Sequence, residues 1–314
     1  MRYRGYPRLR ALSLIKRFSV ITPKPYTARR LVEEVERSFA AHDLHYGHGT
    51  DNPRDEAVYL VFCALGIAFD CPEQDLDAEV GREAAARVFD LARKRVEDRT
   101  PIAYLVNQAW FCGLPFHVDE RVLIPRSPLA ESIENRFAPW LDADRVSSIL
   151  DIGTGSACIA VACALAFPEA RVDAVDISAE ALVVAHGNVE RHGLAERIRL
   201  IKSDLYENLG DRKYDLIVAN PPYVTAREMR ELPPEHRHEP ALALAAGSDG
   251  LDVVRRLLAE SGRHLRPDGI LVVEVGNGRE SVDKTFPSLP FVWLDFEYGG
   301  EGVFLLEARS LKMS

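Results

Sequence analysis

The stretch SSILDIGTGSAC, residues 147–158, decides the fold prediction for this chain. Its first half is a short apolar run typical of a buried β-strand, and Gly153 and Gly155 follow it. Glycines at such a turn let the backbone approach a ligand closely, and the amides that open the next helix face that ligand. No Walker lysine follows, so the turn is not a P-loop, although a mononucleotide site remains a competing interpretation.

Strands and helices alternate from Val146 onward, which is typical of a doubly wound α/β sheet. The last two predicted strands, residues 291–298 and 302–308, are joined by a glycine-rich turn and must therefore be antiparallel neighbours. The other predicted strands are SSILDIG (147–153), RVDAVDIS (171–178), IRLIKSD (198–204), YDLIVAN (214–220) and GILVVEVG (269–276). A Rossmann-like sheet of seven strands with a C-terminal antiparallel hairpin is typical of S-adenosylmethionine-dependent methyltransferases.

Three carboxylates stand at the ends of successive predicted strands: Asp151, Asp176 and Asp204. Asp176 can accept hydrogen bonds from both hydroxyls of a ribose, a role equally expected in an NAD site. Asp204 can accept from an adenine amino group, or it can simply cap a helix. Together they predict a cofactor that carries adenosine, bound where the strand order reverses.

The tetrapeptide Asn220-Pro221-Pro222-Tyr223 ends the fourth predicted strand, beside that cofactor site. Two consecutive prolines stop a strand and hold the neighbouring residues rigid. The Asn220 side-chain oxygen and the Pro221 carbonyl can accept from a planar NH₂ group, and the Tyr223 ring can stack on its plane. In methyltransferases, NPPY at this place marks enzymes that alkylate a planar, weakly nucleophilic nitrogen. A stiff turn without chemistry is the alternative.

The N-terminal third has a different organisation. Residues 1–27 form a predicted basic, flexible extension, and residues 28–100 read as a domain of three amphipathic helices that would recognise the substrate. Residues 101–125 contain strand-like runs broken at Gly113 and Pro115, which predict a β-hairpin linker. The catalytic domain then spans residues 126–314.

Composition narrows the class of protein. The 314 residues carry a net charge of −9, and because residues 1–30 hold nine Lys/Arg and no acid, the remainder has a net charge of −18. An acidic body argues against sequence-specific binding of nucleic acid and suits a basic partner. No apolar run could span a membrane, and five cysteines without paired spacing fit the reducing cytoplasm. The basic start could also be a mitochondrial presequence.

These motifs resemble those of the protein glutamine-N(5) methyltransferases, from about Phe39 to Leu306. The resemblance implies a helical domain, a hairpin linker and an S-adenosylmethionine-binding domain, and an activity that methylates glutamine side chains in translation proteins. Ala157 departs from the family, since it stands where the glycine turn has its third glycine; one methyl group is tolerable there. The expected cofactor contacts are Asp151, Gly153, Thr154, Gly155, Asp176, Asp204 and Asn220.

Longer motifs separate two branches of that family. One branch modifies peptide release factors and typically carries IPRPxTE after the hairpin, whereas this chain has IPRSPLAE at residues 124–131. The segments at 46–61 (YGHGTDNPRDEAVYLV), 103–113 (AYLVNQAWFCG) and 237–251 (RHEPALALAAGSDGL) are similar to the other branch, which modifies ribosomal protein uL3. The resemblance therefore implies a uL3 glutamine as substrate.

Several polar residues remain to be placed. Arg126, His238 and Glu239 are expected to bind the substrate beside Asn220, Pro221, Pro222 and Tyr223, with Arg126 positioning the linker helix or the target loop. For Arg237, His238 and Glu239 a structural salt bridge is nearly as good an explanation. Glu274 either approaches the pocket or faces solvent. His42, His45 and His48 are three apart, but without other ligands nearby we expect surface or loop positions and no metal.

Three rival functions remain. A release-factor methyltransferase has the same chemistry but is disfavoured by the motifs above. An adenine-amino DNA methyltransferase also uses NPPY, but it predicts an extended basic recognition region, which residues 31–314 lack. A non-catalytic binding module would need a damaged glycine turn or a lost Asn220, and both are intact.

Overall fold

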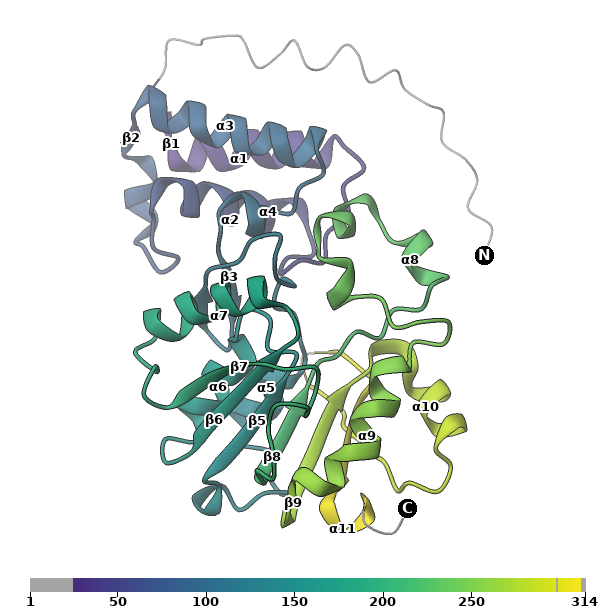
Figure 1. The fold of residues 1–314 in the computed structure, drawn as a ribbon. Coiled ribbons are helices and arrows are strands. Elements are labelled where there is room, and N and C mark those ends of the chain that lie inside the picture. The colour runs from purple at the N-terminus through teal and green to yellow at the C-terminus, as the bar shows by residue number, and fades with distance from the viewer. Residues whose placement is uncertain (1–24, 298, 312–314) are drawn as a thin grey trace.

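The computed structural model describes residues 25–297 and 299–311, so most of the predicted basic extension (residues 1–24) lies outside the described residues. Figure 1 shows a helical unit stacked on an α/β unit, with a short hairpin between them. In the described part of the chain, no helix is both long and apolar enough to cross a membrane.

Three helices form the helical unit, where the apolar periodicity predicted them: α1 (Ala28–Ala40), α2 (Pro53–Leu65) and α3 (Arg82–Glu97). The Thr27 side chain caps α1 and the Asn52 side chain caps α2, with a proline in the first turn of α2 as predicted. The apolar faces of the helices share one core. The shorter elements of this unit are β1 (Tyr26–Thr27), η2 (Glu73–Asp77), β2 (Glu79–Val80) and α4 (Ile102–Leu105).

The predicted hairpin follows as β3 (Ala109–Phe111) and β4 (Leu114–Phe116), which pair antiparallel. Cys112 and Gly113 form its two-residue turn with φ of 48° and 69°, the positive values that such a turn requires. Pro115 does not break the second strand as predicted, because it pairs opposite Trp110 in a ladder of only two strands.

The α/β unit contains the predicted sheet of seven strands, in the order β10-β11-β9-β8-β5-β6-β7. The strands β7, β6, β5, β8 and β9 are parallel, and β11 runs antiparallel to both β9 and β10. The order reverses between β5 and β8, which places a ligand crevice at their carboxyl ends. The strand bounds are β5 (Ser148–Ile152), β6 (Arg171–Asp176), β7 (Ile198–Lys202), β8 (Tyr214–Ala219), β9 (Leu265–Glu274), β10 (Val292–Trp293) and β11 (Val303–Glu307).

The sheet is buried on both faces because alternate residues of each strand enter two different cores. Ile149 and Leu216 face the layer that contains α6 and α7, whereas Leu150 and Ile217 face the layer that contains α9. The helices and 3-10 turns around the sheet are α5 (Leu129–Glu134), η3 (Ala143–Arg145), α6 (Cys158–Ala166), α7 (Ala179–Arg191), α8 (Glu228–Glu231), η4 (Pro234–His238), η5 (Ala241–Ala243), α9 (Asp252–His264), η6 (Gly276–Gly278), α10 (Arg279–Thr285) and α11 (Ala308–Leu311).

One predicted strand is much shorter than expected. Within residues 291–297 the strand pairing covers Val292 and Trp293, and the Leu294 amide adds one bond to the Val303 carbonyl at 2.9 Å. Beyond them the chain turns toward α5, where the Glu297 amide donates to both oxygens of Glu131, at 3.1 and 3.0 Å. The alternation of apolar residues therefore overstated the strand.

Candidate active site

The glycine turn that follows β5 is held against the neighbouring strand. The amides of Gly153 and Thr154 both donate to the Val175 carbonyl at 2.9 Å, and Gly153 and Gly155 adopt positive φ. Ala157 caps α6 with φ of 64° and is fully buried. The single methyl group is thus accommodated, in a backbone conformation that costs an alanine about 1–2 kcal/mol.

Asp151 is a buried carboxylate beneath this turn. Its Oδ2 accepts from the Thr154 hydroxyl at 2.6 Å, while its Oδ1 has no hydrogen-bond partner among the described residues. Burial raises the pKa of Asp151 to about 7. A buried oxygen with an unused lone pair beside a glycine turn fits a ligand that brings a donor or a positive charge.

The other two strand-end carboxylates differ in what holds them. Asp176 accepts from the Gly155 amide at 2.9 Å and from the Ser178 amide at 2.8 Å, and burial raises its pKa. Each oxygen keeps a second lone pair for a ribose hydroxyl. Asp204 forms an ion pair with Arg256 of α9 at 2.9 Å, a partner that the sequence did not indicate. If Asp204 accepts from the adenine amino group as predicted, its carboxylate does so while also paired with Arg256.

The Asn220-Pro221-Pro222-Tyr223 turn lies directly against the glycine turn. A Cβ atom built on Gly153 would stand 3.9 Å from the Asn220 carbonyl oxygen. Pro221 is buried, and no described residue forms a hydrogen bond with the Asn220 side chain. The Asn220 amide is therefore available for a ligand that enters between the two turns.

Tyr223 is fixed from several sides. Its hydroxyl donates to Glu274 Oε1 at 3.1 Å, and a Cβ on Gly276 would come within 2.7 Å of the tyrosine ring. Glu274 also accepts from the Ser127 hydroxyl, and burial raises the pKa of this glutamate. Glu274 thus approaches the pocket, and the alternative of a solvent-facing carboxylate is wrong. Ser127 was not singled out from the sequence.

A cavity of about 470 Å³ opens beside the turn. Its walls include Arg126, Asn220, Tyr223 and His236, so three predicted site residues meet there. Pro221 and Pro222 form the turn behind the wall. His238 is directed elsewhere: its Nε2 contacts the Asp98 carbonyl at the end of α3, at 2.9 Å.

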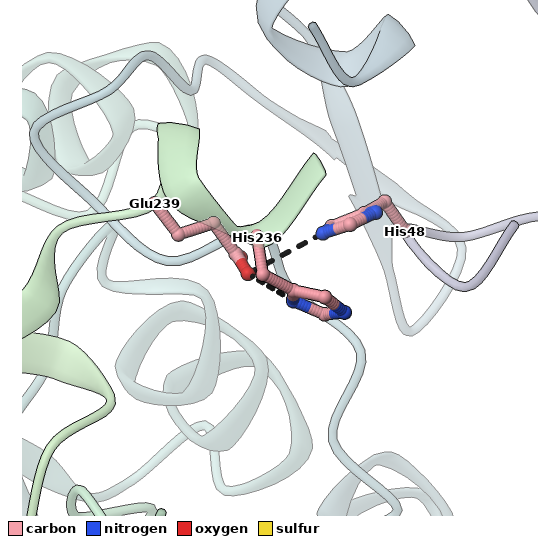
Figure 2. Close-up of side chains that lie close together, drawn as sticks. All are labelled: His48, His236 and Glu239. Atoms are coloured by element: carbon pink, nitrogen blue, oxygen red, sulfur yellow. Dashed lines mark hydrogen bonds and ion pairs between the residues drawn. The ribbon is translucent and has the colours of Figure 1, made fainter. Parts of the chain in front are cut away.

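Glu239 lies outside the cavity lining and forms a buried hub (Figure 2). Both of its oxygens accept from the Arg126 guanidinium, at 2.5 and 2.9 Å. His48 and His236 approach Oε2 at 3.3 and 3.0 Å. Although burial alone would raise it, bonds from His236 and His48 and the Arg126 charge hold the pKa of Glu239 well below its usual range. Glu239 therefore takes part in a structural salt bridge, which was the alternative expected for it, but its partner is Arg126, which the sequence did not pair with it.

The nitrogen and oxygen atoms of His48, His236 and Glu239 lie within 4.8 Å of one another, a spacing compatible with a metal ion. The sequence did not predict this cluster. His48 lies in a loop, as one of the two expected positions has it, but it is buried, with 6% of its surface exposed. The Arg126 charge already occupies both Glu239 oxygens and would oppose a second cation. We therefore interpret the cluster as a carboxylate bonded to two histidines.

The buried contact between the helical unit and the α/β unit, which we call the seam, consists of His48, Arg95, Arg126, Glu235, His236 and Glu239. Its second carboxylate is Glu235. Glu235 Oε1 accepts from Arg95 at 3.0 Å, from Arg99 at 3.1 Å and from the His45 amide at 3.0 Å, while its Oε2 has no partner among the described residues. Arg95 also binds Glu56 at 3.0 Å. Neither Arg95 nor Glu235 was singled out from the sequence, because their partners lie far along the chain.

Comparison with known proteins agrees with this geometry. A family model described as Methyltransferase small domain matches residues 135–232. Among solved structures, the hMettl16 catalytic domain in complex with the MAT2A 3′UTR hairpin 6 has a TM-score of 0.50 at 18% identity, over 72% of this chain and 82% of that one. The fold is therefore that of the S-adenosylmethionine-dependent methyltransferases, as predicted.

Three curated relatives are similar over nearly the whole chain, and each is named ribosomal protein uL3 glutamine methyltransferase. The protein from Francisella tularensis subsp. tularensis is 43% identical over 90% of both chains. Those from Burkholderia pseudomallei and Bordetella pertussis are 46% and 47% identical, over 92% and 91% of this chain and 97% and 96% of theirs. The chain belongs to this family of methyltransferases, which confirms the family expected from the motifs.

Proposed function

We propose that this enzyme transfers a methyl group from S-adenosylmethionine to the side-chain amide nitrogen of a glutamine in ribosomal protein uL3. The observation that carries the proposal is the Asn220 side-chain amide, which no described residue engages. This side chain lines the cavity, while the Asn220 carbonyl lies against the glycine turn. The names of the three relatives support uL3 as the substrate.

The glycine turn and its carboxylates fit the cofactor. Asp151 Oδ1 is a buried acceptor with no partner in the described part of the chain, and a carboxylate beside the amino group of the cofactor would be ionised. Gly153, Thr154 and Gly155 offer their backbone, Asp176 the ribose acceptors, and Asp204 an acceptor for the adenine amino group. When bound, the cofactor supplies an electrophilic methyl group on its sulfonium, next to Asn220.

The NPPY turn solves the chemical difficulty of the acceptor. The lone pair of an amide nitrogen is delocalised into its carbonyl, so the nitrogen must be held and its lone pair directed at the methyl group. The Asn220 side-chain oxygen and the Pro221 carbonyl accept from the two N–H groups, while Tyr223 stacks on the amide plane. Such alignment is worth about 7–11 kcal/mol at most. A methyl group accepted from the cofactor would leave a surplus proton on the amide nitrogen, and water can take up that proton.

The other predicted roles follow from this assignment. The helical unit (residues 28–100), joined through the hairpin at 101–125 to the catalytic domain at 126–314, recognises uL3, free or in an assembly intermediate. Arg126, His238 and Glu239 order the substrate. Arg126 lines the cavity, whereas His238 and Glu239 hold in place the segment that runs from the cavity to the helical unit. The reaction takes place in the cytoplasm, consistent with five free thiols.

The test uses uL3 and a release factor purified from cells that lack such methyltransferases. Labelled S-adenosylmethionine is added to each, and mass spectrometry locates the methyl group. We expect label on a uL3 glutamine. Label on the release factor alone would support the glutamine chemistry but not uL3 as the substrate. A third tube contains unmethylated DNA, and label on its adenine alone would reject both the chemistry and the substrate.

A variant tests the mechanism separately. Asn220→Ala should bind the cofactor and unfold like wild type, yet lose about 100-fold to 1,000-fold in turnover, the usual cost of one preorganised contact to a developing charge. Turnover comes from single-turnover methylation rates and binding from calorimetry. Wild-type rates from this variant would refute the role of Asn220.

A further inference from the structure

Two large aromatic side chains are exposed where the helical unit meets the hairpin. Phe69, just after α2, is 47% exposed, and Trp110, in β3, is 42% exposed. Their rings contact edge to face, with centroids 5.6 Å apart. Single exposed apolar residues are ordinary, but two large rings in contact form a patch.

Buried rings support this pair. Tyr59 and Phe62 of α2 lie against Phe69, with ring centroids 6.1 and 5.6 Å from it, and both are nearly buried. The Tyr59 hydroxyl donates to the carbonyl of Gln108, at the start of the hairpin. These four rings, which we call the aromatic platform, therefore join the helical unit to the hairpin and hold Phe69 and Trp110 in place.

The chain next to the platform is strongly acidic. Residues 68–81 contain no lysine or arginine. Arg29 pairs with two of the acidic side chains, Glu73 at 3.5 Å and Asp77 at 2.9 Å. This acidic border consists of the exposed residues Asp70, Glu73, Asp75, Asp77 and Glu79.

We propose that the aromatic platform docks a lysine- and arginine-rich segment of the protein substrate, distinct from the segment whose glutamine enters the cavity. The inference rests on the proposed function only in taking the partner to be the methyl acceptor. Lysine and arginine are attracted to aromatic faces, and the acidic border attracts the same charges. Exposed tryptophan is also among the side chains that dominate binding energy at interfaces.

The charge of the border favours a polypeptide over a nucleic acid. Aromatic rings can stack on nucleobases, but binding proteins combine them with basic grooves that follow the phosphates. The acidic border, which begins at Asp70 directly after Phe69, would instead repel a phosphate backbone. The same border would repel a second copy of this chain, whose residues 31–314 are net acidic.

The test compares full-length Trp110→Ala and Phe69→Ala with Trp140→Ala, a control tryptophan in the α/β unit that is 38% exposed. Binding of labelled uL3 is measured without cofactor, and methylation is measured with uL3 and with a short glutamine peptide that lacks a basic segment. We expect Kd and KM for uL3 to rise at least tenfold in the first two variants only. The KM for the short peptide should not change.

A second pair of variants leaves the ring packing intact. Asp70→Lys and Asp75→Lys reverse exposed charges of the border and should weaken uL3 binding severalfold, with a smaller dependence on salt. This result would support docking even if an alanine variant fails to fold. Unchanged uL3 binding in both lysine variants and in Trp110→Ala would overturn the proposal.

Two further outcomes would also overturn it. Competition by short single-stranded RNA that is lost in Trp110→Ala would make the platform a nucleic-acid site. Tighter uL3 binding after replacement of Arg2, Arg4, Arg8 and Arg10 by Gln would mean that the basic start of this chain covers the platform. If uL3 binds through the platform but is not methylated, the proposed function fails and the docking surface stands.

Discussion

Asp151, near the carboxyl end of the central strand β5, and Glu239, at the seam between the two units, are both buried carboxylates. Their hydrogen-bond partners differ in number and in distance along the chain. Asp151 has one side-chain partner, three residues away, and one oxygen without a partner among the described residues. Both Glu239 oxygens accept several bonds, from residues as far as 191 positions away. The first arrangement leaves a lone pair for a ligand, whereas the second holds the fold together.

Glu235 limits how far this comparison can be taken. Its Oε2 also has no partner among the described residues, but Arg95 and Arg99 already balance its charge from the other oxygen. An unused oxygen therefore indicates a ligand site only where the carboxylate also lacks a cation, and no Lys or Arg among residues 25–297 and 299–311 forms an ion pair with Asp151.

The largest effect should come from breaking the seam. Arg95→Leu leaves the carboxylates of Glu56 and Glu235 buried without their shared partner, so the free energy of unfolding should fall by about 3–5 kcal/mol. Arg93→Leu is the matched control, since Arg93 lies on the same helix and forms two exposed ion pairs worth less than about 1 kcal/mol each. Urea unfolding at pH 7 measures both. Equal losses would show that the seam is not structural.

The next effect concerns the acceptor at the sheet edge. Asp151→Asn should weaken cofactor binding by about tenfold to a hundredfold, because a hydrogen bond to a charged group contributes about 1.5–3 kcal/mol. In wild type, affinity should rise between pH 6 and 8, since the pKa of Asp151 is about 7 and a cationic ligand favours its ionised form. Calorimetry at three pH values measures both. Asp215→Asn is the control, because Asp215 lies near the start of β8, at the opposite end of the strands from the glycine turn. Binding to wild type that does not change with pH would contradict the prediction.

A smaller effect distinguishes the histidine of the seam. Burial lowers the pKa of His48, so the unfolded chain takes up its proton first as the pH falls below the ordinary histidine value. Stability should therefore decline from pH 7 to pH 5, and His48→Gln should reduce that decline. Asp151 acts in the opposite direction and is common to both proteins. Urea unfolding at pH 5, 6 and 7 measures the slope, and exposed His42→Gln should keep the slope of wild type.

The smallest effect should occur at Ala157. Replacing it by glycine relieves a left-handed conformation worth about 1–2 kcal/mol, but removes a buried methyl group worth about 0.8 kcal/mol and adds freedom to the unfolded chain worth about 0.4–1 kcal/mol. The net change should stay below about 1 kcal/mol. Ala160→Gly, inside α6, should destabilise by more than that. Thermal unfolding of both variants provides the comparison, and a larger loss at Ala157 would contradict this balance.

The contrast between Asp151 and Glu239 also explains what the sequence could predict. The strands, the glycine turn and the NPPY motif depend on neighbours within a few residues, so their positions follow from local patterns. The seam depends on His48 meeting Glu239 and on Arg95 meeting Glu235, which are 191 and 140 positions apart. A single sequence contains no signal for such pairs, and for this reason the burial of His48 and the contact of Ser127 with Glu274 were missed.

The seam also sets the order in which the molecule can be completed on the ribosome. The core of the helical unit uses residues 28–102, so it can close early in synthesis. His48 then lacks Glu239, and Arg95, although it can already pair with Glu56, lacks Glu235, until these two carboxylates have been made more than a hundred residues later. His236, which lies between them in sequence, joins the cavity wall at the same step, whereas Asn277, Gly278 and Ser281 of that wall are made later still. A nascent chain should therefore have a folded helical unit well before its cavity can bind the glutamine that accepts the methyl group.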